Sequence, residues 1–407
     1  MPLWDAGGPA HDGSMTDEAA DRARPGRAAQ SDVIPVGVCV VATRVAVPVL
    51  EDLPDPAGKA VLVRATFDRP LADDPALPLA FARARGLAAT IDWLTTRGAR
   101  VTVCGNPTGN GAAEEAHHLD RVRQSIGSLL AAASAPGAVT FRPCPEVAAS
   151  VDRLIEDHHL FVNDTLQDSA LPLPSLTRPP RRLPSAAGRT LEHDVQVLSP
   201  LLATPARPFV AVLGGTRSSD RLHGLQGLVL RADTVLLGGA LALPLLQAIG
   251  KQPVDSTSDE FLWECRTVVG LSRRLHHQVV MPLDLVWERE DGSVVTTPAD
   301  VRGDGHVVDV GPVTRVRFAE VVHGAGVTLW AGALGRVEDP AFAEGTRAVA
   351  ASLPAAGSPV VLGGDALVSA LGASSLVPSS AKFLSATDAS IELLKAGDLP
   401  GLAALRH

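Results

Sequence analysis

Short apolar runs alternate with amphipathic stretches along the chain from about residue 34 to the end. Ala60–Arg64, an apolar run that a single arginine closes, is typical of a buried strand, whereas Leu79–Arg97 has the apolar spacing of a helix. The other expected elements of the first half are strands at Val101–Cys104, Val139–Phe141 and Leu160–Val162 and helices at Asp120–Ala133 and Glu146–Asp157, and a helix at Leu191–Leu202 then leads towards the centre of the chain. This β–α alternation predicts a parallel sheet covered by helices on both faces.

A second series of the same kind fills the other half of the chain. Its expected strands are Phe209–Leu213, Thr234–Leu237, Val279–Met281, Thr328–Trp330 and Val360–Leu362. Its expected helices are Leu222–Leu230, Ala242–Ala248, Asp259–Leu275, Phe318–Val322, Pro340–Ser352 and Asp365–Leu371. Between the two series, the proline-rich residues 171–189 predict an irregular crossing segment near a hinge. Residues 1–33 lack periodicity and are expected to be a disordered lead, within which Met15 is an alternative start.

The stretch FVAVLGGTRSSDR at 209–221 is the strongest candidate for an anion site. An apolar strand leads into Gly214 and Gly215, which permit a tight turn, and helix-starting residues follow. Free N–H groups and the positive end of a helix dipole then lie together, which suits a phosphate. Arg217 and Arg221 are four residues apart and share a helix face, so they could grip that phosphate. The alternative is an ordinary strand-to-helix turn with solvated arginines.

Other expected strands of the second series also end in glycine, notably Gly238-Gly239 and Gly363-Gly364. Ligands of such folds bind at the carboxyl ends of the strands. Asp365 directly follows the last pair, where its carboxylate could serve a Mg²⁺–phosphate complex. An equally natural local interpretation is that Asp365 caps the helix that follows it.

Composition narrows the function classes. A chain of 407 residues is long enough for two or three domains. Its formal net charge of −9 argues against nucleic acid or a membrane surface as partner. No apolar run reaches transmembrane length, so we expect a cytoplasmic protein. The four cysteines, Cys39, Cys104, Cys144 and Cys265, lack metal-site spacing. All but Cys144 lie in apolar surroundings, where buried reduced thiols are the default interpretation.

Taken together, these pieces resemble the phosphoglycerate kinase family from about Ile34 to Leu405. The segments that carry the resemblance are FVAVLGGTRSSDR, LLGGALA at 236–242, MPLDLV at 281–286, VDVGP at 308–312, WAGALGRVEDPAFAEGTRA at 330–348 and IELLKAGDLPGLAAL at 391–405. The resemblance implies two doubly wound, Rossmann-like α/β domains with parallel sheets, joined by a hinge. We expect an acceptor-side domain at 34–190, a nucleotide-binding domain at 191–390 and a segment at 391–407 that packs back on the first domain.

The resemblance further implies a glycolytic kinase that moves a phosphoryl group between ATP or ADP, with Mg²⁺, and a carboxylate. On the nucleotide side, Gly238 and Gly239 match the adenine site and Glu338 matches the ribose-binding glutamate. Asp365 matches the aspartate near Mg²⁺. Arg217 and Arg221 replace two phosphate-binding lysines and are the expected catalytic residues. The further expected nucleotide-side positions are Gly214, Gly215, Gly363, Gly364 and Pro312, the last of which, like Asp284, we interpret as structural.

The acceptor side departs from the family pattern. Arg64 and Arg83 match family arginines, but Thr66 replaces the glycerate-binding aspartate and Asp68 replaces an asparagine. The loop at Asn106 has lost its histidine and arginine, and two further basic segments are deleted or replaced. Charged hydrogen bonds contribute about 1.5–3 kcal/mol each, so these losses cost on the order of 5–10 kcal/mol of binding. We expect poor or absent turnover of 3-phosphoglycerate.

One change touches the loop whose N–H groups face the transferred phosphoryl group. This glycine-rich loop of the family reads Ala386-Thr387-Asp388, and Asp388 adds a negative charge unless it only caps the last helix. Three hypotheses stay open: a phosphotransferase active on a carboxylate, a nucleotide-binding sensor or partner protein with little kinase activity, and an enzyme for a less anionic acceptor. We expect a monomer whose partners are a nucleotide and a small acidic metabolite.

Overall fold

The computed structural model describes residues 45–67, 78–106, 112–130, 138–215, 219–254, 257–353, 358–371 and 375–407. The chain divides into Met1–Val40 and Val41–His407, and every described residue belongs to the second part. The lead predicted at 1–33 therefore lies outside the described residues. None of the helices within the described ranges is long and apolar enough to cross a bilayer.

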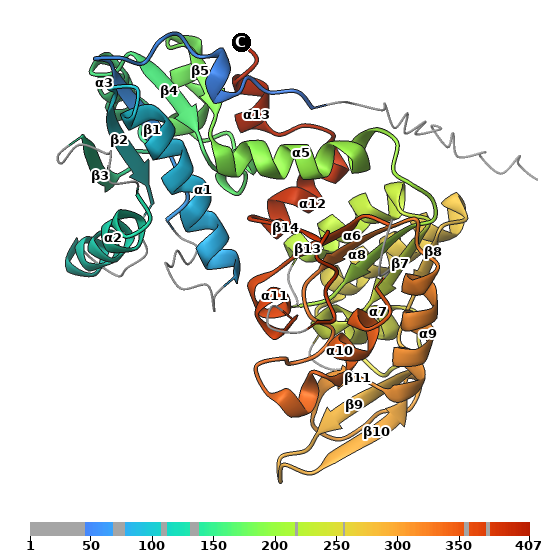
Figure 1. Ribbon diagram of the computed structural model, residues 1–407. Coiled ribbons are helices and arrows are strands. Elements are labelled where there is room, and N and C mark those ends of the chain that lie inside the picture. The colour runs from blue at the N-terminus through green and yellow to red at the C-terminus, as the bar shows by residue number, and fades with distance from the viewer. Residues whose placement is uncertain are drawn as a thin grey trace, which may run out of the picture. The chain divides into compact units, whose positions relative to one another are not determined.

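The first sheet has five parallel strands in the order β3-β2-β1-β4-β5 (Figure 1). The strands are β1 (Ala60–Arg64), β2 (Arg100–Gly105), β3 (Val139–Pro143), β4 (Leu160–Asn163) and β5 (Ser185–Ala187). The helices of this half are α1 (Pro78–Thr95), α2 (Ala112–Gly127) and α3 (Ala148–Glu156). Val61 and Val63 of β1 belong to the same buried cluster as Ile91 of α1, whereas Leu62 belongs to the cluster that includes Leu191. The sheet is thus covered on both faces, as its apolar strands require.

The second sheet has six parallel strands in the order β14-β13-β12-β6-β7-β8. They are β6 (Phe209–Leu213), β7 (Thr234–Leu237), β8 (Gln278–Val280), β12 (Val327–Ala331), β13 (Val360–Gly363) and β14 (Lys382–Leu384). The helices are α6 (Ser219–Arg231), α7 (Ala242–Ala248), α8 (Asp259–Leu275), α9 (Pro312–His323), α10 (Glu344–Ala350) and α11 (Asp365–Leu371). Ala211 of β6 shares a buried cluster with Leu225 of α6, and Val212 shares another with Phe318 of α9. The fold predicted from sequence, two parallel-sheet α/β domains, is confirmed.

One local prediction was wrong, and one small sheet was not predicted at all. Residues 171–189 are not wholly irregular, because they contain α4 (Pro174–Thr177), a 3₁₀ turn at Pro179–Arg181 and β5, which completes the first sheet beside β4. The sequence analysis also missed an antiparallel sheet of order β10-β9-β11. Its strands are β9 (Asp284–Glu288), β10 (Val294–Pro298) and β11 (His306–Val310).

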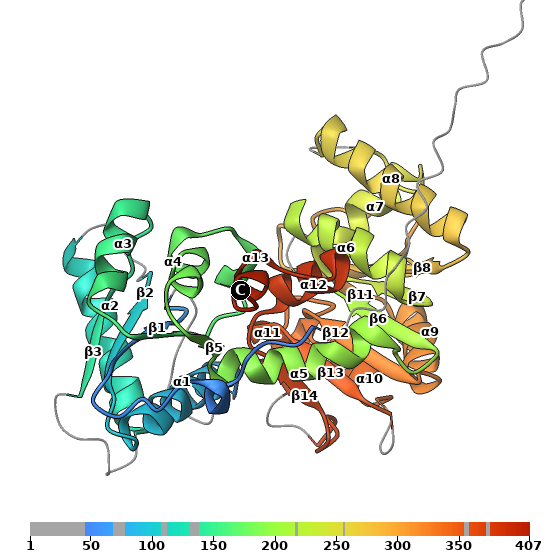
Figure 2. The ribbon, with the colours of Figure 1, turned by 90° about the horizontal axis from the view of Figure 1, so that it is seen from above.

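The end of the chain packs against both halves, since α12 (Thr387–Ala396) contacts α6 as well as elements of the first half. Helix α5 (Arg189–Ala203) contacts both α1 and α12. Helix α13 (Pro400–Ala404) contacts α4 and the 3₁₀ turn η2 at Asp168–Ala170 (Figure 2). A Cβ on Gly401 would lie 2.6 Å from the Ser169 hydroxyl, so this contact is close.

Candidate functional site

Glycines at the carboxyl ends of four neighbouring strands bring their backbones together at one edge of the second sheet. Gly215, Gly239, Gly332 and Gly364 follow β6, β7, β12 and β13 and have φ angles of +85°, +59°, +86° and +110°. Side chains rarely tolerate this region of backbone space. A Cβ on Gly239 would lie 2.5 Å from the backbone nitrogen of Gly215. The glycines therefore leave an open, backbone-lined surface where parallel strands place their ligands.

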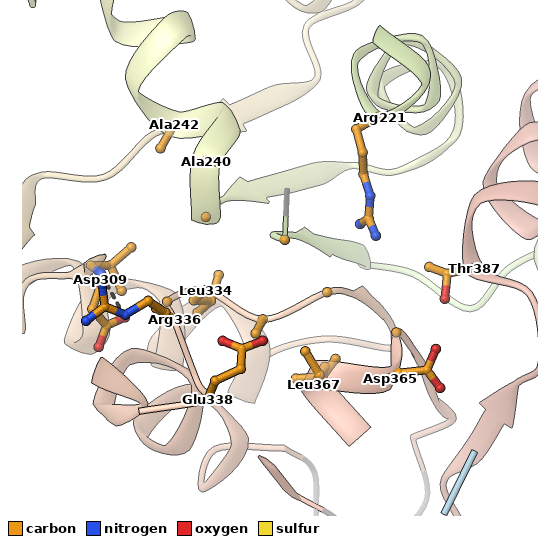
Figure 3. Close-up of a pocket in the computed structure, with 18 of the residues that line it drawn as sticks. Arg221, Ala240, Ala242, Asp309, Leu334, Arg336, Glu338, Asp365, Leu367 and Thr387 are labelled. Carbon is orange, nitrogen blue, oxygen red and sulfur yellow. Dashed lines mark hydrogen bonds between the residues drawn. The ribbon is translucent and has the colours of Figure 1, made fainter. Parts of the chain in front are cut away.

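A cavity of about 370 Å³ lies at this edge. Its volume falls within the range of small-molecule sites, roughly 300–1,000 Å³. Figure 3 shows the guanidinium of Arg221 and the carboxylate of Glu338 pointing toward the space between them, with Asp365 beside Leu367. The polar side chains that line the cavity are Arg83, Arg221, Asp309, Arg336, Glu338, Asp365, Ser385, Thr387 and Asp388.

Most of the residues predicted for the nucleotide side gather here. The members that line the cavity are Gly215, Arg221, Gly239, Glu338, Gly364 and Asp365. Gly214, Gly238 and Gly363 each precede one of these glycines and do not line the cavity themselves. An added Cβ on them would collide with Ala333, Leu334 and Thr387, respectively. Pro312 begins α9 and is not among the lining residues. Arg217 lies outside the described residues.

Asp284 binds the first turn of α9, the helix that begins at Pro312. The carboxylate of Asp284 accepts hydrogen bonds from the backbone N–H groups of Val313 and Thr314, at 3.0 and 2.8 Å, and from the Thr314 hydroxyl at 2.6 Å. These contacts satisfy helix N–H groups that lack partners within the helix. The structural interpretation of Asp284 therefore has a geometric basis.

Arg221 is held by the strand ends and by a carboxylate. Its Nη1 donates to the carbonyl oxygens of Gly214 and Ala331, both at 3.0 Å. Its Nε lies 3.2 Å from Oδ1 of Asp388. The N-cap of α12 is Ala386, and Asp388 instead lines the cavity as the second helical residue. The negative charge of Asp388 that the sequence analysis expected near the transferred phosphoryl group is thus present at the cavity, where it pairs with Arg221.

Asp365 forms a second ion pair at the cavity. Its two carboxylate oxygens accept from Nη1 and Nη2 of Arg83, at 2.9 and 3.1 Å. Nε of Arg83 donates to the carbonyl oxygen of Ser385 at 2.9 Å, and the arginine is only 7% exposed. The arginine predicted for the acceptor and the carboxylate predicted for the metal therefore neutralise each other.

Arg64, the other predicted acceptor arginine, is completely buried. Its Nη1 lies 3.0 Å from Oδ2 of Asp168, and its Nη2 lies 3.4 Å from Oε1 of Glu146. The Nδ2 of Asn106 also approaches Glu146, at 3.5 Å. Two carboxylates of the chain therefore balance this guanidinium, which leaves it little charge to offer a ligand.

Thr66, the remaining described acceptor candidate, belongs to a polar cluster at the end of the first sheet. Its hydroxyl contacts the hydroxyl of Thr165 and lies 3.5 Å from Oδ2 of Asp168. Thr66, Thr165 and Arg83 line a small hollow of about 20 Å³, too small for a metabolite as it stands. Asp68 lies outside the described residues.

Two buried aspartates lie beside this hollow. Asp164 lines it, and Asp194 binds Ser385, which also lines it. Asp164 accepts hydrogen bonds from the backbone N–H and hydroxyl of Thr190, both at 2.9 Å, and from the hydroxyl of Thr90 at 3.2 Å. Burial nevertheless raises the pKa of Asp164 to about 7. Asp194 accepts from the N–H of Ser385 at 3.0 Å and also from its hydroxyl, and burial raises the pKa of Asp194 to about 6.

The sequence analysis did not single out two residues that line the cavity. Asp309 of β11 is buried, accepts from the N–H of Gly345 at 2.8 Å, and has a pKa that burial raises to about 6. Arg336 pairs with Glu288 at 2.8 Å and stands over the Phe342 ring. Both lie within segments that carry the family resemblance, VDVGP and WAGALGRVEDPAFAEGTRA, which was the available signal.

The fold and the cavity define an α/β protein of two parallel-sheet domains whose ligand-sized cavity lies at the carboxyl edge of the second sheet. A family model described as phosphoglycerate kinase matches residues 142–397. The phosphoglycerate kinase of Parafrankia sp. (strain EAN1pec) is 31% identical over 395 residues, covering 86% of this chain and 97% of that protein. A phosphoglycerate kinase of Thermus thermophilus is 34% identical over 271 residues, covering 64% of this chain and 68% of that protein.

Solved structures show the same fold. The crystal structure of phosphoglycerate kinase from Pyrococcus horikoshii OT3 matches with a TM-score of 0.70 at 20% identity, covering 88% of this chain and 98% of that one. The phosphoglycerate kinase structure from Coxiella burnetii also gives 0.70, at 22% identity and with coverage of 88% and 99%. The chain belongs to the phosphoglycerate kinase family, a family of kinase-type phosphotransferases.

Proposed function

We propose that the chain is a phosphoglycerate-kinase-type phosphotransferase that retains much of the nucleotide side and has a weakened site for 3-phosphoglycerate. The observation that supports this proposal best is the cavity that collects Gly215, Gly239, Glu338, Gly364 and Asp365. These residues come from four separate segments of the chain, and each was expected on the nucleotide side from the family resemblance.

The cavity fits ATP or ADP in one direction. Gly239 lines the cavity with its backbone, beside which adenine would pack, and the exposed carboxylate of Glu338 is available for the ribose hydroxyls. Arg221, at the other side of the cavity, would then face the phosphates (Figure 3). A guanidinium with a fixed orientation stabilises the charge of a transferring phosphoryl group by positioning and electrostatics.

A magnesium ion fits this site under one condition. Within the described ranges, no group of three or more His, Cys, Asp or Glu side chains could hold a metal ion. Mg²⁺ typically binds through one or two carboxylates together with substrate phosphates, so Asp365 alone is sufficient when a nucleotide is present. Bound there, the ion would neutralise phosphate charge. Asp365 must first leave Arg83, which holds both of its oxygens.

Ion pairs within the chain support the proposal of a weakened acceptor site. Arg64, Arg83 and Arg221 each pair with a carboxylate of the chain, namely Asp168, Asp365 and Asp388. An anionic acceptor has to replace at least one of these partners, and it competes against a carboxylate that is already in place. Charged hydrogen bonds contribute about 1.5–3 kcal/mol each, so the competition removes much of the binding energy that a free arginine would supply.

The same ion pairs favour a second candidate function. A nucleotide-binding protein with little or no kinase activity, acting as a sensor or a partner protein, needs the cavity but not a cationic acceptor site. A kinase for a less anionic acceptor is also compatible with Thr66 and Thr165 at the end of the first sheet. Fold alone does not decide between these functions.

Calorimetric titration with MgADP and MgATP tests the nucleotide site. Replacing Glu338 with Ala should weaken binding by about tenfold, equivalent to 1.4 kcal/mol, because a ribose contact is lost. Glu344→Ala is the matched control, since Glu344 is also exposed, lies six residues further along and does not line the cavity. Equal affinities for Glu338→Ala and Glu344→Ala would remove Glu338 from the site. Absence of nucleotide binding by the unmodified protein would overturn the proposed function.

A further inference from the structure

Two cysteines face each other inside the first domain. Cys104 is in β2 and Cys144 directly follows β3, and their Sγ atoms are 3.0 Å apart. Both side chains are buried, with exposures of 1% and 9%. The backbone N–H of Cys144 donates to the carbonyl oxygen of Gly105 at 2.9 Å, so the two segments are also joined through their backbones. A sulfur–sulfur approach this short places the thiols within reach of bond formation.

The surroundings make the two thiols unequal. The hydrogen bond from Cys104 and the charge of the buried Arg64 lower the pKa of Cys144. The same thiol pair and the burial raise the pKa of Cys104 well above its ordinary value. Because the thiolate is the reactive form of cysteine, Cys144 is the nucleophile of the pair and Cys104 holds the proton. The greater exposure of Cys144 agrees with this assignment.

We propose that Cys104 and Cys144 form a redox-active dithiol that exchanges with a small-molecule disulfide such as oxidised glutathione. The Cys144 thiolate attacks one sulfur of the small disulfide, which forms a mixed disulfide and releases one thiolate. Cys104 then loses its proton and attacks the Cys144 sulfur, which expels the second thiolate. Two protein thiols are oxidised to one disulfide, and one small disulfide is reduced to two thiols.

The bond would act on the region around Arg64. It would tie the end of β2, which continues into Asn106, to the segment after β3 that carries Glu146. Glu146 is a partner of both Arg64 and Asn106. Oxidation would also remove the negative charge that the thiol pair can present to Arg64. The inference rests on the geometry of the two thiols and does not depend on the proposed kinase activity.

The test is thiol counting after incubation of the full chain with oxidised glutathione, followed by acid quenching, alkylation and peptide mapping. The sequence has four cysteines, so the reduced protein titrates four thiols under denaturing conditions. We expect the treated protein to lose two of them and to yield a peptide that links Cys104 to Cys144. Dithiothreitol should restore both thiols.

Three variants make the result specific. Cys265→Ser, which changes a buried cysteine in α8, should still lose two thiols and give the same linked peptide. Cys104→Ser should instead trap the mixed disulfide on Cys144. Cys144→Ser should keep its three thiols and carry no adduct on Cys104. Retention of all four thiols by the unmodified protein, or a linked peptide that contains another cysteine, would overturn the proposal.

Discussion

Arg83 of α1 and Asp365 at the start of α11, 282 positions apart in the chain, form a two-pronged ion pair with N–O distances of 2.9 and 3.1 Å. One belongs to the half expected to hold the acceptor, and the other to the half expected to hold the nucleotide. Neither can serve a ligand while the pair is formed. In the proposed function, substrate binding must therefore start with the breaking of the ion pair between Arg83 and Asp365.

Replacing Arg83 with Ala should strengthen the binding of MgADP by about two- to fivefold. The change releases the carboxylate of Asp365 for the metal, and the gain is small because Asp365 is 41% exposed and its ion pair is screened by solvent. Calorimetry with and without Mg²⁺ separates the two effects of the substitution. The gain should appear only when the metal is present, and an equal gain for metal-free ADP would show that Asp365 does not serve the metal.

Arg85→Ala is the matched control for Arg83→Ala. Arg85 lies on the same helix, is exposed and stands over the ring of Phe81. It does not line the cavity at the carboxyl edge of the second sheet. We expect its replacement to leave MgADP affinity unchanged, because the loss of one positive charge at a distance is screened at physiological ionic strength.

Asp388→Asn should raise the affinity for ADP and ATP by about three- to tenfold. The substitution removes the carboxylate 3.2 Å from Arg221 and lets the guanidinium face the phosphates. The range corresponds to about 0.7–1.4 kcal/mol and allows for the partial exposure of Asp388. Binding of adenosine, which has no phosphate, serves as the reference. An identical change for adenosine would contradict the assignment of Arg221 to the phosphates.

Glu392→Gln controls for the loss of a negative charge from the same helix. Glu392 is in α12 with Asp388, but it pairs with Lys395 at 3.3 Å and does not line the cavity. Its replacement should leave nucleotide affinity unchanged. A gain equal to that of Asp388→Asn would indicate a general effect of net charge instead of the release of Arg221.

Asp164 should make stability fall with rising pH. Burial raises its native pKa to about 7, whereas an unfolded aspartate has a pKa of about 3.9. The native state keeps a proton that the unfolded state has lost, so this contribution to stability is full below about pH 4 and disappears as the pH rises through 7. The slope of the unfolding free energy from this residue is about −1.4 kcal/mol per pH unit.

Chemical denaturation at several pH values between about 4.5 and 6.5 checks this prediction. Asp164→Asn should make the pH dependence shallower than in the unmodified protein. Asp152→Asn is the control, because Arg178 lowers the pKa of Asp152 and its titration falls below this window. An Asp164→Asn profile parallel to that of the unmodified protein would show that Asp164 is ionised in the native state.

The second sheet and the glycines at its carboxyl edge were predictable from short sequence patterns. Gly214-Gly215 and Gly238-Gly239 follow apolar runs that read as buried strands, and the structure places both pairs at strand ends. Helices with strong start and stop signals were also predictable, and the bounds of Asp259–Leu275 agree with α8. These features depend on neighbours in the sequence, which a single chain displays directly.

Features that depend on distant contacts could not be found in the same way. Val294–Pro298 is a strand only because it pairs with β9, and its alternate exposed residues give no buried run. β5 follows a proline-rich segment that gives no strand signal, and it forms because it pairs with the edge of β4. Nothing local distinguishes Arg83 from a free cation or Asp365 from a helix cap, and only the fold brings them together.

The central claim, that the cations expected to hold a phosphorylated acid are already neutralised by the chain, is tested most directly by steady-state kinetics. A coupled assay would vary 3-phosphoglycerate at saturating MgATP, with nucleotide binding established separately. We predict no saturation at millimolar 3-phosphoglycerate and a kcat/KM below about 10⁴ M⁻¹s⁻¹, the lower end of ordinary enzymes. Saturation in the micromolar range with a kcat/KM above that value would contradict the account.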